Sequence, residues 1–85
     1  MAKVEIYTKD WCPYCAHAQR LLAESGAEVV EYKVNMGGEK KAEMIQRAGG
    51  RTTFPQIFIG DRHIGGCDDL FDLQRSGKLA GLLAA

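Results

Sequence analysis

Two cysteines three positions apart are the residues of this sequence best suited to chemistry. Cys12 and Cys15 enclose Pro13-Tyr14 near the start of an 85-residue chain, and a third cysteine, Cys67, stands far from them. At the start of a helix, positions i and i+3 have Cα atoms about 5–6 Å apart, a separation that a disulfide accepts. The pair is therefore suited to reversible oxidation and reduction.

The surrounding residues predict that this pair lies where a strand passes into a helix. Residues 3–7 alternate polar and apolar side chains as strands do, residues 8–12 read as a loop, and Pro13 suits the first turn of a helix. Cys12 would then face unpaired amides and the positive end of the helix dipole, which favour the thiolate. Cys15, one turn inward, would be less exposed and less acidic. We expect Cys12 to attack and Cys15 to resolve.

A metal site and a purely structural role are the alternatives for the pair. Zinc prefers four ligands, and one Cys-x-x-Cys motif supplies two. Cys67, His17 and His63 could supply others, but the sequence has no second close-spaced pair. A cysteine pair at a strand-to-helix junction in a βαβ pattern is typical of redox proteins, so we favour redox chemistry and predict no metal.

Length and composition restrict the class of protein. With 46% hydrophobic and 26% charged residues, we expect one folded domain spanning residues 1–85. Eleven basic residues balance eleven acidic ones, which argues against non-specific binding to nucleic acid or a membrane surface. No apolar run resembles a signal peptide or a membrane span. An odd number of cysteines disfavours a secreted disulfide scaffold, so we expect a cytoplasmic protein.

Strand-like and helix-like blocks alternate along the chain. Strands are expected at residues 3–7, 28–34, 54–59 and 63–64, and helices at 14–24, 39–48 and from 67 to about 75, with a short helical turn at 79–85. Within these blocks we expect Val30 and Tyr32 to share a face, Ala42 and Met44 to point inward, and Met36 to lie in a turn. The order β-α-β-α-β-β-α predicts an α/β fold with one four-stranded mixed sheet flanked by helices.

Three motifs in sequence order carry a resemblance to a known family. They are Lys9 before Cys-Pro-Tyr-Cys at 12–15, Thr-Phe-Pro-Gln-Ile-Phe-Ile at 53–59, and Gly-Gly-Cys-Asp-Asp-Leu at 65–70. Together they resemble the dithiol glutaredoxins, especially the small bacterial glutaredoxin 3 type, over essentially the whole chain. The resemblance implies a thioredoxin fold and glutathione-dependent thiol–disulfide exchange, with glutathione as co-substrate and no tightly bound cofactor.

The resemblance also implies roles around the reacting sulfur. Cys12 would attack the mixed disulfide between glutathione and a protein, and Cys15 would resolve intramolecular disulfides. Thr53, Phe54 and Pro55 would be part of the glutathione site, where Pro55 would be a cis-proline that leaves the backbone of Phe54 free to hydrogen-bond a peptide-like ligand.

Other residues would contact glutathione itself. Lys9 would meet its glycine carboxylate, with Arg51 as a second candidate cation, and Tyr14 would flank the sulfur. The backbone of Cys67 and Asp68 would receive the γ-glutamyl carboxylate at a helix N-terminus. Asp68 or Asp69 would either meet the γ-glutamyl amine or cap the helix.

Several alternatives stay open at this point. Cys67 is expected to contribute its backbone, the alternative being a third redox-active thiol. Trp11 and the bulky Phe54 depart from the family pattern and bear on substrate preference. Disulfide-bonded or glutathionylated proteins are the expected partners of a monomer. The alternative functions are a redoxin fed by thioredoxin reductase that serves ribonucleotide reductase, and a [2Fe–2S] scaffold. The scaffold lacks support because its usual Cys-Gly-Phe-Ser motif is absent.

Overall fold

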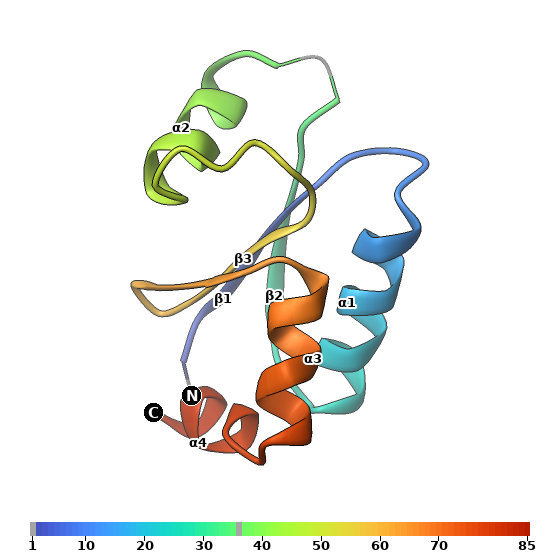
Figure 1. Ribbon diagram of the computed structural model, residues 1–85, viewed down its shortest axis with the longest axis vertical. Coiled ribbons are helices and arrows are strands. Elements are labelled where there is room, and N and C mark those ends of the chain that lie inside the picture. The colour runs from blue at the N-terminus through green and yellow to red at the C-terminus, as the bar shows by residue number, and fades with distance from the viewer. Residues whose placement is uncertain (1, 36) are drawn as a thin grey trace.

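The computed structural model describes residues 2–35 and 37–85, so the predicted turn position of Met36 lies outside the described residues. Its strands are β1 (Val4–Thr8), β2 (Val29–Lys33), β3 (Gln56–Ile59) and β4 (Arg62–Gly65). Its helices are α1 (Pro13–Glu24), α2 (Glu39–Arg47), α3 (Cys67–Arg75) and α4 (Leu79–Ala84) (Figure 1). Every element expected from the sequence is present, including the final short helix.

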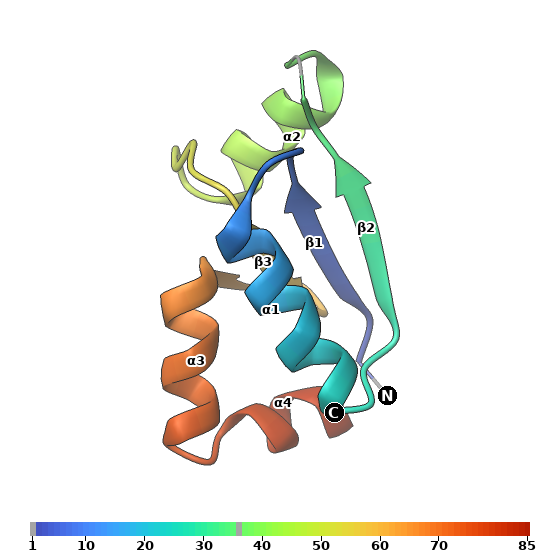
Figure 2. The ribbon, with the colours of Figure 1, turned by 90° about the vertical axis from the view of Figure 1, so that its right-hand side faces the viewer.

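The four strands form one mixed sheet in the order β2-β1-β3-β4. β1 runs parallel to β2 (Figure 2). β1 is antiparallel to β3, and β3 and β4 form an antiparallel hairpin. Tyr7 of β1 stands opposite Tyr32 of β2 and Gln56 of β3. This confirms the predicted α/β fold with a four-stranded mixed sheet.

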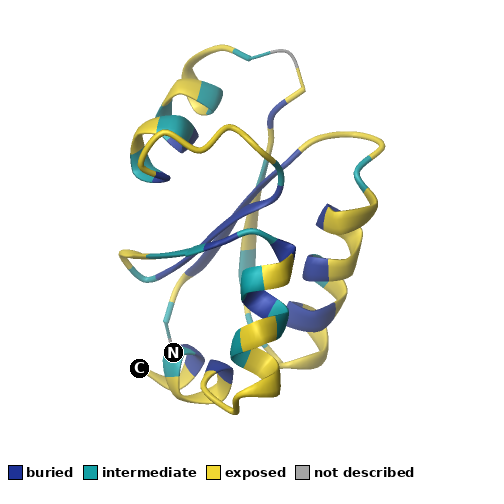
Figure 3. Cartoon of the chain, in the orientation of Figure 1, coloured by how far each residue is buried: buried dark blue, intermediate teal, exposed yellow. Residues whose placement is uncertain are grey.

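Helices cover both faces of the sheet and bury two apolar clusters. α1, α3 and α4 pack with one face, and α2 packs on the other (Figures 1 and 2). The first cluster consists of Val4, Ile6, Ala18, Leu21, Leu22, Ile57, Ile59, Cys67, Leu70, Leu79 and Leu83. The second consists of Tyr7, Val34, Met44, Ala48 and Phe58. Burial therefore concentrates along the two central strands, β1 and β3, and on the inward sides of the helices (Figure 3).

A polar network fastens α2 to the sheet. Arg47 donates from Nη2 to Glu5 Oε1 at 3.0 Å and from Nη1 to the Tyr7 hydroxyl at 2.8 Å. The Tyr7 hydroxyl donates to the Glu43 carboxylate, and the Tyr32 hydroxyl donates to Glu5 Oε2 at 2.8 Å. Burial alone would raise the pKa of Glu5, but hydrogen bonds from Arg47 and Tyr32 lower it below its usual value. Glu5 is therefore held as a carboxylate inside the fold.

Three side chains differ from the sequence-based expectation. Ala42 is exposed, because it lies about 200° around the helix from the buried Met44, whereas Ala48 lies one turn from Met44 and is buried. Val30 is 42% exposed because β2 is an edge strand. Glu5 is buried although it alternates with apolar residues, because β1 has a strand on each side and α2 above it.

Candidate active site

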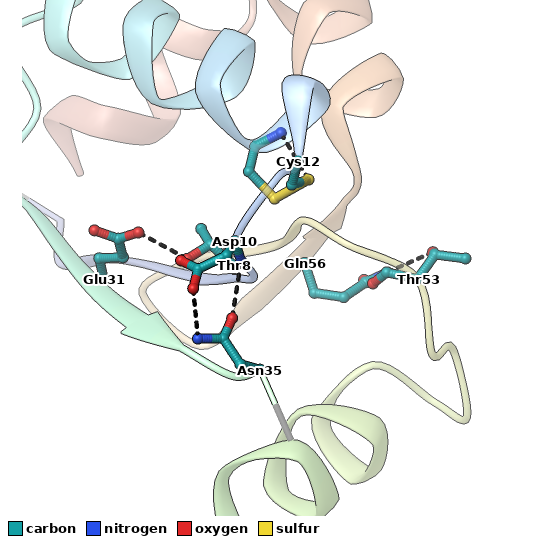
Figure 4. Close-up of a disulfide and its surroundings, with 8 residues drawn as sticks. Thr8, Asp10, Cys12, Glu31, Asn35, Thr53 and Gln56 are labelled. Carbon is teal, nitrogen blue, oxygen red and sulfur yellow. Dashed lines mark hydrogen bonds between the residues drawn. A yellow bond between two sulfur atoms is a disulfide. The ribbon is translucent and has the colours of Figure 1, made fainter. Parts of the chain in front are cut away.

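Cys12 and Cys15 form a disulfide at the N-terminus of α1, with Cα atoms 5.2 Å apart (Figure 4). Cys12 is the N-cap residue of the helix, and its Sγ accepts a hydrogen bond from the backbone amide of Cys15 at 3.1 Å. Cys15 is 3% exposed, whereas Cys12 is partly exposed. The predicted strand-to-helix position and the unequal exposure of the two sulfurs are both present.

The loop that presents Cys12 is tied to the end of β2. Asp10 donates its backbone amide to Asn35 Oδ1 at 2.8 Å, and Asn35 returns a hydrogen bond from Nδ2 to Asp10 Oδ2 at 2.9 Å (Figure 4). Lys33 adds an ion pair to Asp10 at 3.2 Å. Trp11, next to Cys12, has φ of 58° and is 98% exposed, so its indole lies in solvent beside the disulfide.

A pocket of about 310 Å³ lies beside the first turn of α1. It is lined by Tyr14, Arg51, Thr53, Phe54, Pro55, Gly66, Cys67, Asp68 and Asp69. All of these except Gly66 were predicted for the site, Arg51 as the second candidate cation. Tyr14, which lies between the two cysteines in the sequence, connects the pocket to the disulfide. The predicted Lys9 is exposed, and its Nζ lies 5.6 Å from the centre of the Phe54 ring.

One wall of the pocket is the segment leading into β3. The Phe54–Pro55 peptide bond is cis, as the resemblance to the dithiol glutaredoxins implies. Gln56, the next residue, donates from Nε2 to the Thr53 carbonyl oxygen at 3.0 Å and to Thr53 Oγ1 at 3.2 Å (Figure 4). The cis bond and these hydrogen bonds together shape the wall formed by residues 53–55.

The opposite wall is the N-terminus of α3. The Asp69 carboxylate caps this helix by accepting from the Gly66 amide at 2.9 Å, and Arg51 pairs with it at 3.3 Å. The Gly66 hydrogen bond lowers the pKa of Asp69; burial opposes this, and Arg51 lowers it further. Of the two predicted roles, capping therefore belongs to Asp69. The neighbouring Asp68 is exposed.

Cys67 is buried in this wall, 8% exposed and not disulfide-bonded. Burial, and then the charge of Asp68, raises the pKa of its thiol. A thiol with a raised pKa is a poor nucleophile because the thiolate is the reactive form. Cys67 therefore differs chemically from Cys12, which stands at a helix N-cap.

Gln56 and His63 were not among the residues predicted for this site. The available signal was the polar Gln56 inside an otherwise apolar strand, since a buried amide needs hydrogen-bond partners. Within residues 2–35 and 37–85, His, Cys, Asp and Glu form no group of three or more able to hold a metal ion. None of the helices in the same residues is both long and apolar enough to cross a bilayer.

Comparison with known proteins identifies the family. The glutaredoxin family model matches residues 4–64. The chain is 53% identical to Glutaredoxin 3 of Escherichia coli K12 over 83 residues, which cover 98% of this chain and 99% of that protein. The solution structure of glutaredoxin from Brucella melitensis, 55% identical, has a TM-score of 0.84 and covers 98% of this chain and 89% of that one.

The crystal structure of a buckwheat glutaredoxin–glutathione complex, 30% identical, has a TM-score of 0.86 and covers 98% of this chain and 77% of that one. Similarity therefore extends over nearly the whole length in sequence and in structure. The chain belongs to the glutaredoxin family of thiol–disulfide oxidoreductases.

Proposed function

We propose that this protein reduces protein disulfides and glutathione mixed disulfides through Cys12 and Cys15, with glutathione as the electron donor. The observation that carries the proposal is the position of Cys12 as the N-cap of α1, where its sulfur accepts the Cys15 amide hydrogen bond. A sulfur so placed is stabilised as a thiolate once the disulfide is reduced. The buckwheat relative solved as a glutathione complex supports glutathione as the ligand.

For a glutathione mixed disulfide, Cys12 acts alone. Its thiolate attacks the glutathione sulfur, a new S–S bond forms between Cys12 and glutathione, and the protein sulfur leaves as a thiolate that takes up a proton. A second glutathione thiolate then attacks the glutathione sulfur. This releases glutathione disulfide and returns Cys12 as a thiolate. Each exchange moves one electron pair between sulfurs, and its rate depends on the attacking and leaving thiolates.

For a protein disulfide, both cysteines take part. Cys12 attacks one sulfur of the substrate and forms a mixed disulfide with the protein. The thiolate of Cys15 then attacks Cys12, which releases the substrate as a dithiol and produces the Cys12–Cys15 disulfide present in this structure. Two glutathione molecules restore the dithiol. The burial of Cys15 suits this second role, since it reaches Cys12 but not the solvent.

The pocket beside Tyr14 has the charges that glutathione requires. We assign the γ-glutamyl carboxylate to the backbone amides of Cys67 and Asp68 at the start of α3, an arrangement that binds anions. The glycine carboxylate is assigned to Lys9 and Arg51, and the ligand backbone to Phe54. Arg51 lines the pocket, and Lys9 lies against the Phe54 ring.

The proposal extends to the setting in which the protein works. Residues 1–85 act as one monomeric glutaredoxin domain in the cytoplasm. The partners are glutathione and disulfide-bonded or glutathionylated proteins, with ribonucleotide reductase as a candidate. The zero net charge of the chain agrees with a small peptide ligand held by local charges.

Turnover of hydroxyethyl disulfide with glutathione, glutathione reductase and NADPH tests the proposal. We expect Cys12→Ser to abolish turnover. The variant Cys15→Ser should retain activity on glutathione mixed disulfides and lose most of its activity on protein disulfides. Undetectable turnover by the wild-type protein, or full activity of Cys12→Ser, contradicts the proposal. Faster reduction by thioredoxin reductase than by glutathione would point to the alternative electron donor.

A further inference from the structure

Gln56 is a fully buried polar residue at the start of β3, and both polar atoms of its amide have partners. Its Nε2 donates to the carbonyl oxygen and to the hydroxyl of Thr53, at 3.0 and 3.2 Å. Its Oε1 lies 2.7 Å from Nε2 of His63. A buried amide lowers stability unless its hydrogen bonds are made. These contacts therefore fix the side chain of Gln56.

The backbone carbonyl of Thr53 determines which atoms donate and which accept in the hydrogen bonds that link Thr53, Gln56 and His63. A backbone carbonyl only accepts, so the nitrogen of the Gln56 amide faces Thr53 and the oxygen faces His63. Because that oxygen also only accepts, Nε2 of His63 carries the proton and donates it. The hydrogen bonds run from His63 to Gln56 to Thr53, and turning the Gln56 amide over would break them.

His63 is itself held in place by the β3–β4 hairpin. It pairs with Phe58 across the two strands, and the rings stack with centres 4.9 Å apart and planes at 28°. Burial, and then the charge of Arg51, lowers the pKa of His63 below its usual value of 6.5. The ring is therefore neutral at pH 7, with its single proton on Nε2.

We propose that Gln56 and His63 are positioning residues for the glutathione pocket, which hold Thr53 and thereby the wall 53–55 in the orientation that receives the ligand. Neither residue is part of the pocket lining, whereas Thr53, Phe54 and Pro55 are. They act through Thr53, without contact to ligand or sulfur. The inference rests on the proposed function, because it takes glutathione as the occupant of this pocket.

Kinetics with a glutathionylated peptide as substrate test this role. Gln56→Leu has similar size and removes all three hydrogen bonds, while His63→Phe keeps the ring against Phe58 and removes only the N–H donor. We expect KM for the peptide to rise about tenfold in Gln56→Leu and about threefold in His63→Phe, with kcat within about twofold of wild type. A tenfold change equals about 1.4 kcal/mol, which is the net worth of one or two hydrogen bonds.

Two controls separate positioning from general stability. In the Gln56→Leu background, adding His63→Phe should leave KM unchanged, because His63 acts only through Gln56. Leu83→Ala removes a core side chain in α4, at the opposite end of the molecule from the start of α1 (Figure 1). It should lower Tm without raising KM. All assays are run well below the Tm of each variant.

The outcomes distinguish this inference from the function on which it rests. A wild-type KM in Gln56→Leu, or a fall in kcat in place of a rise in KM, overturns the positioning role alone. A wild-type protein that does not reduce the glutathionylated peptide overturns the proposed function and the inference together. Should Gln56→Leu fail to fold, His63→Phe decides the matter by the same KM criterion.

Discussion

Gly65, the last residue of β4, occupies a position that no other residue can take without disturbing the pocket. Its φ of +117° is one that side chains rarely adopt. A Cβ there would lie 2.3 Å from Asp69 Oδ2 and 2.8 Å from Arg51 Nη1. We therefore expect Gly65→Ala to push the Asp69 carboxylate off the Gly66 amide that it caps.

Two contributions set the size of the effect. The backbone conformation costs about 1–2 kcal/mol for a residue with a Cβ. Asp69 Oδ2 is the end of a side chain, so it swings aside, and the protein loses its hydrogen bond to Gly66. Such a bond to a charged group is worth about 1.5–3 kcal/mol, and the lower figure applies because Asp69 is 46% exposed. The loss is then about 3 kcal/mol, or a Tm lower by at least about 12 °C.

Gly77→Ala is the matched control. Gly77 has φ of +76°, and a Cβ there would meet no atom within 4 Å, so this variant loses only the contribution of the backbone conformation. Urea unfolding followed by circular dichroism compares the two variants with wild type. We expect Gly65→Ala to be less stable than Gly77→Ala by about 1.5 kcal/mol. Equal losses would refute the reasoning, because crowding against Asp69 would then contribute nothing.

Three further predictions concern groups away from the disulfide. Cys67→Ala should keep glutathione-dependent turnover within about twofold of wild type, because the buried thiol has a raised pKa and the glutathione contact proposed for Cys67 is made by its backbone amide. A larger loss would assign a role to its sulfur. Burial alone would raise the pKa of Glu5, but the hydrogen bonds from Arg47 and Tyr32, together with the charges of Arg47 and Lys3, lower it below its usual value of 4.5. Glu5 therefore stabilises the fold above its unfolded pKa, and that contribution is lost as pH falls through the lower folded pKa. The free energy of unfolding should thus fall on acidification below about pH 4.5, and Arg47→Met should make that fall smaller. If the pH dependence of the free energy of unfolding is the same in Arg47→Met as in wild type, Arg47 does not lower the pKa of Glu5. Burial, with the hydrogen bond to Glu43, raises the pKa of Tyr7 to about 12. In an absorbance titration, the difference between wild type and Tyr7→Phe is the phenolate signal of Tyr7, and it should develop near pH 12 and not near pH 10.

Local patterns were enough to predict the elements and the reacting pair. The helix that starts at Pro13 depends on proline, whose ring restricts the backbone and suits the first turn of a helix. The spacing of Cys12 and Cys15 determines their separation as soon as a helix begins there. Each of these properties depends on residues within one helical turn of each other, so it can be read from the sequence.

Side-chain exposure was predicted less well, because it depends on neighbours that are distant in the chain. Glu5 alternates with apolar residues as an exposed position would, yet Arg47 from α2 pairs with it inside the fold. Val30 was predicted to share a strand face with Tyr32, but that face is not covered at Val30, which is 42% exposed at the sheet edge. Ala42 was expected to point inward, and α2 turns it to the solvent.

The order of elements, the fold class, and the identity and spacing of the two sulfurs can be predicted from the amino-acid sequence, because they follow from local periodicity and from residue chemistry. The pairing of Asp69 with Arg51 and the hydrogen bond between Gln56 and His63 depend on the tertiary structure. In both cases the partners come from different elements. A hydrogen bond between them exists only once the sheet and helices have brought donor and acceptor within about 3 Å.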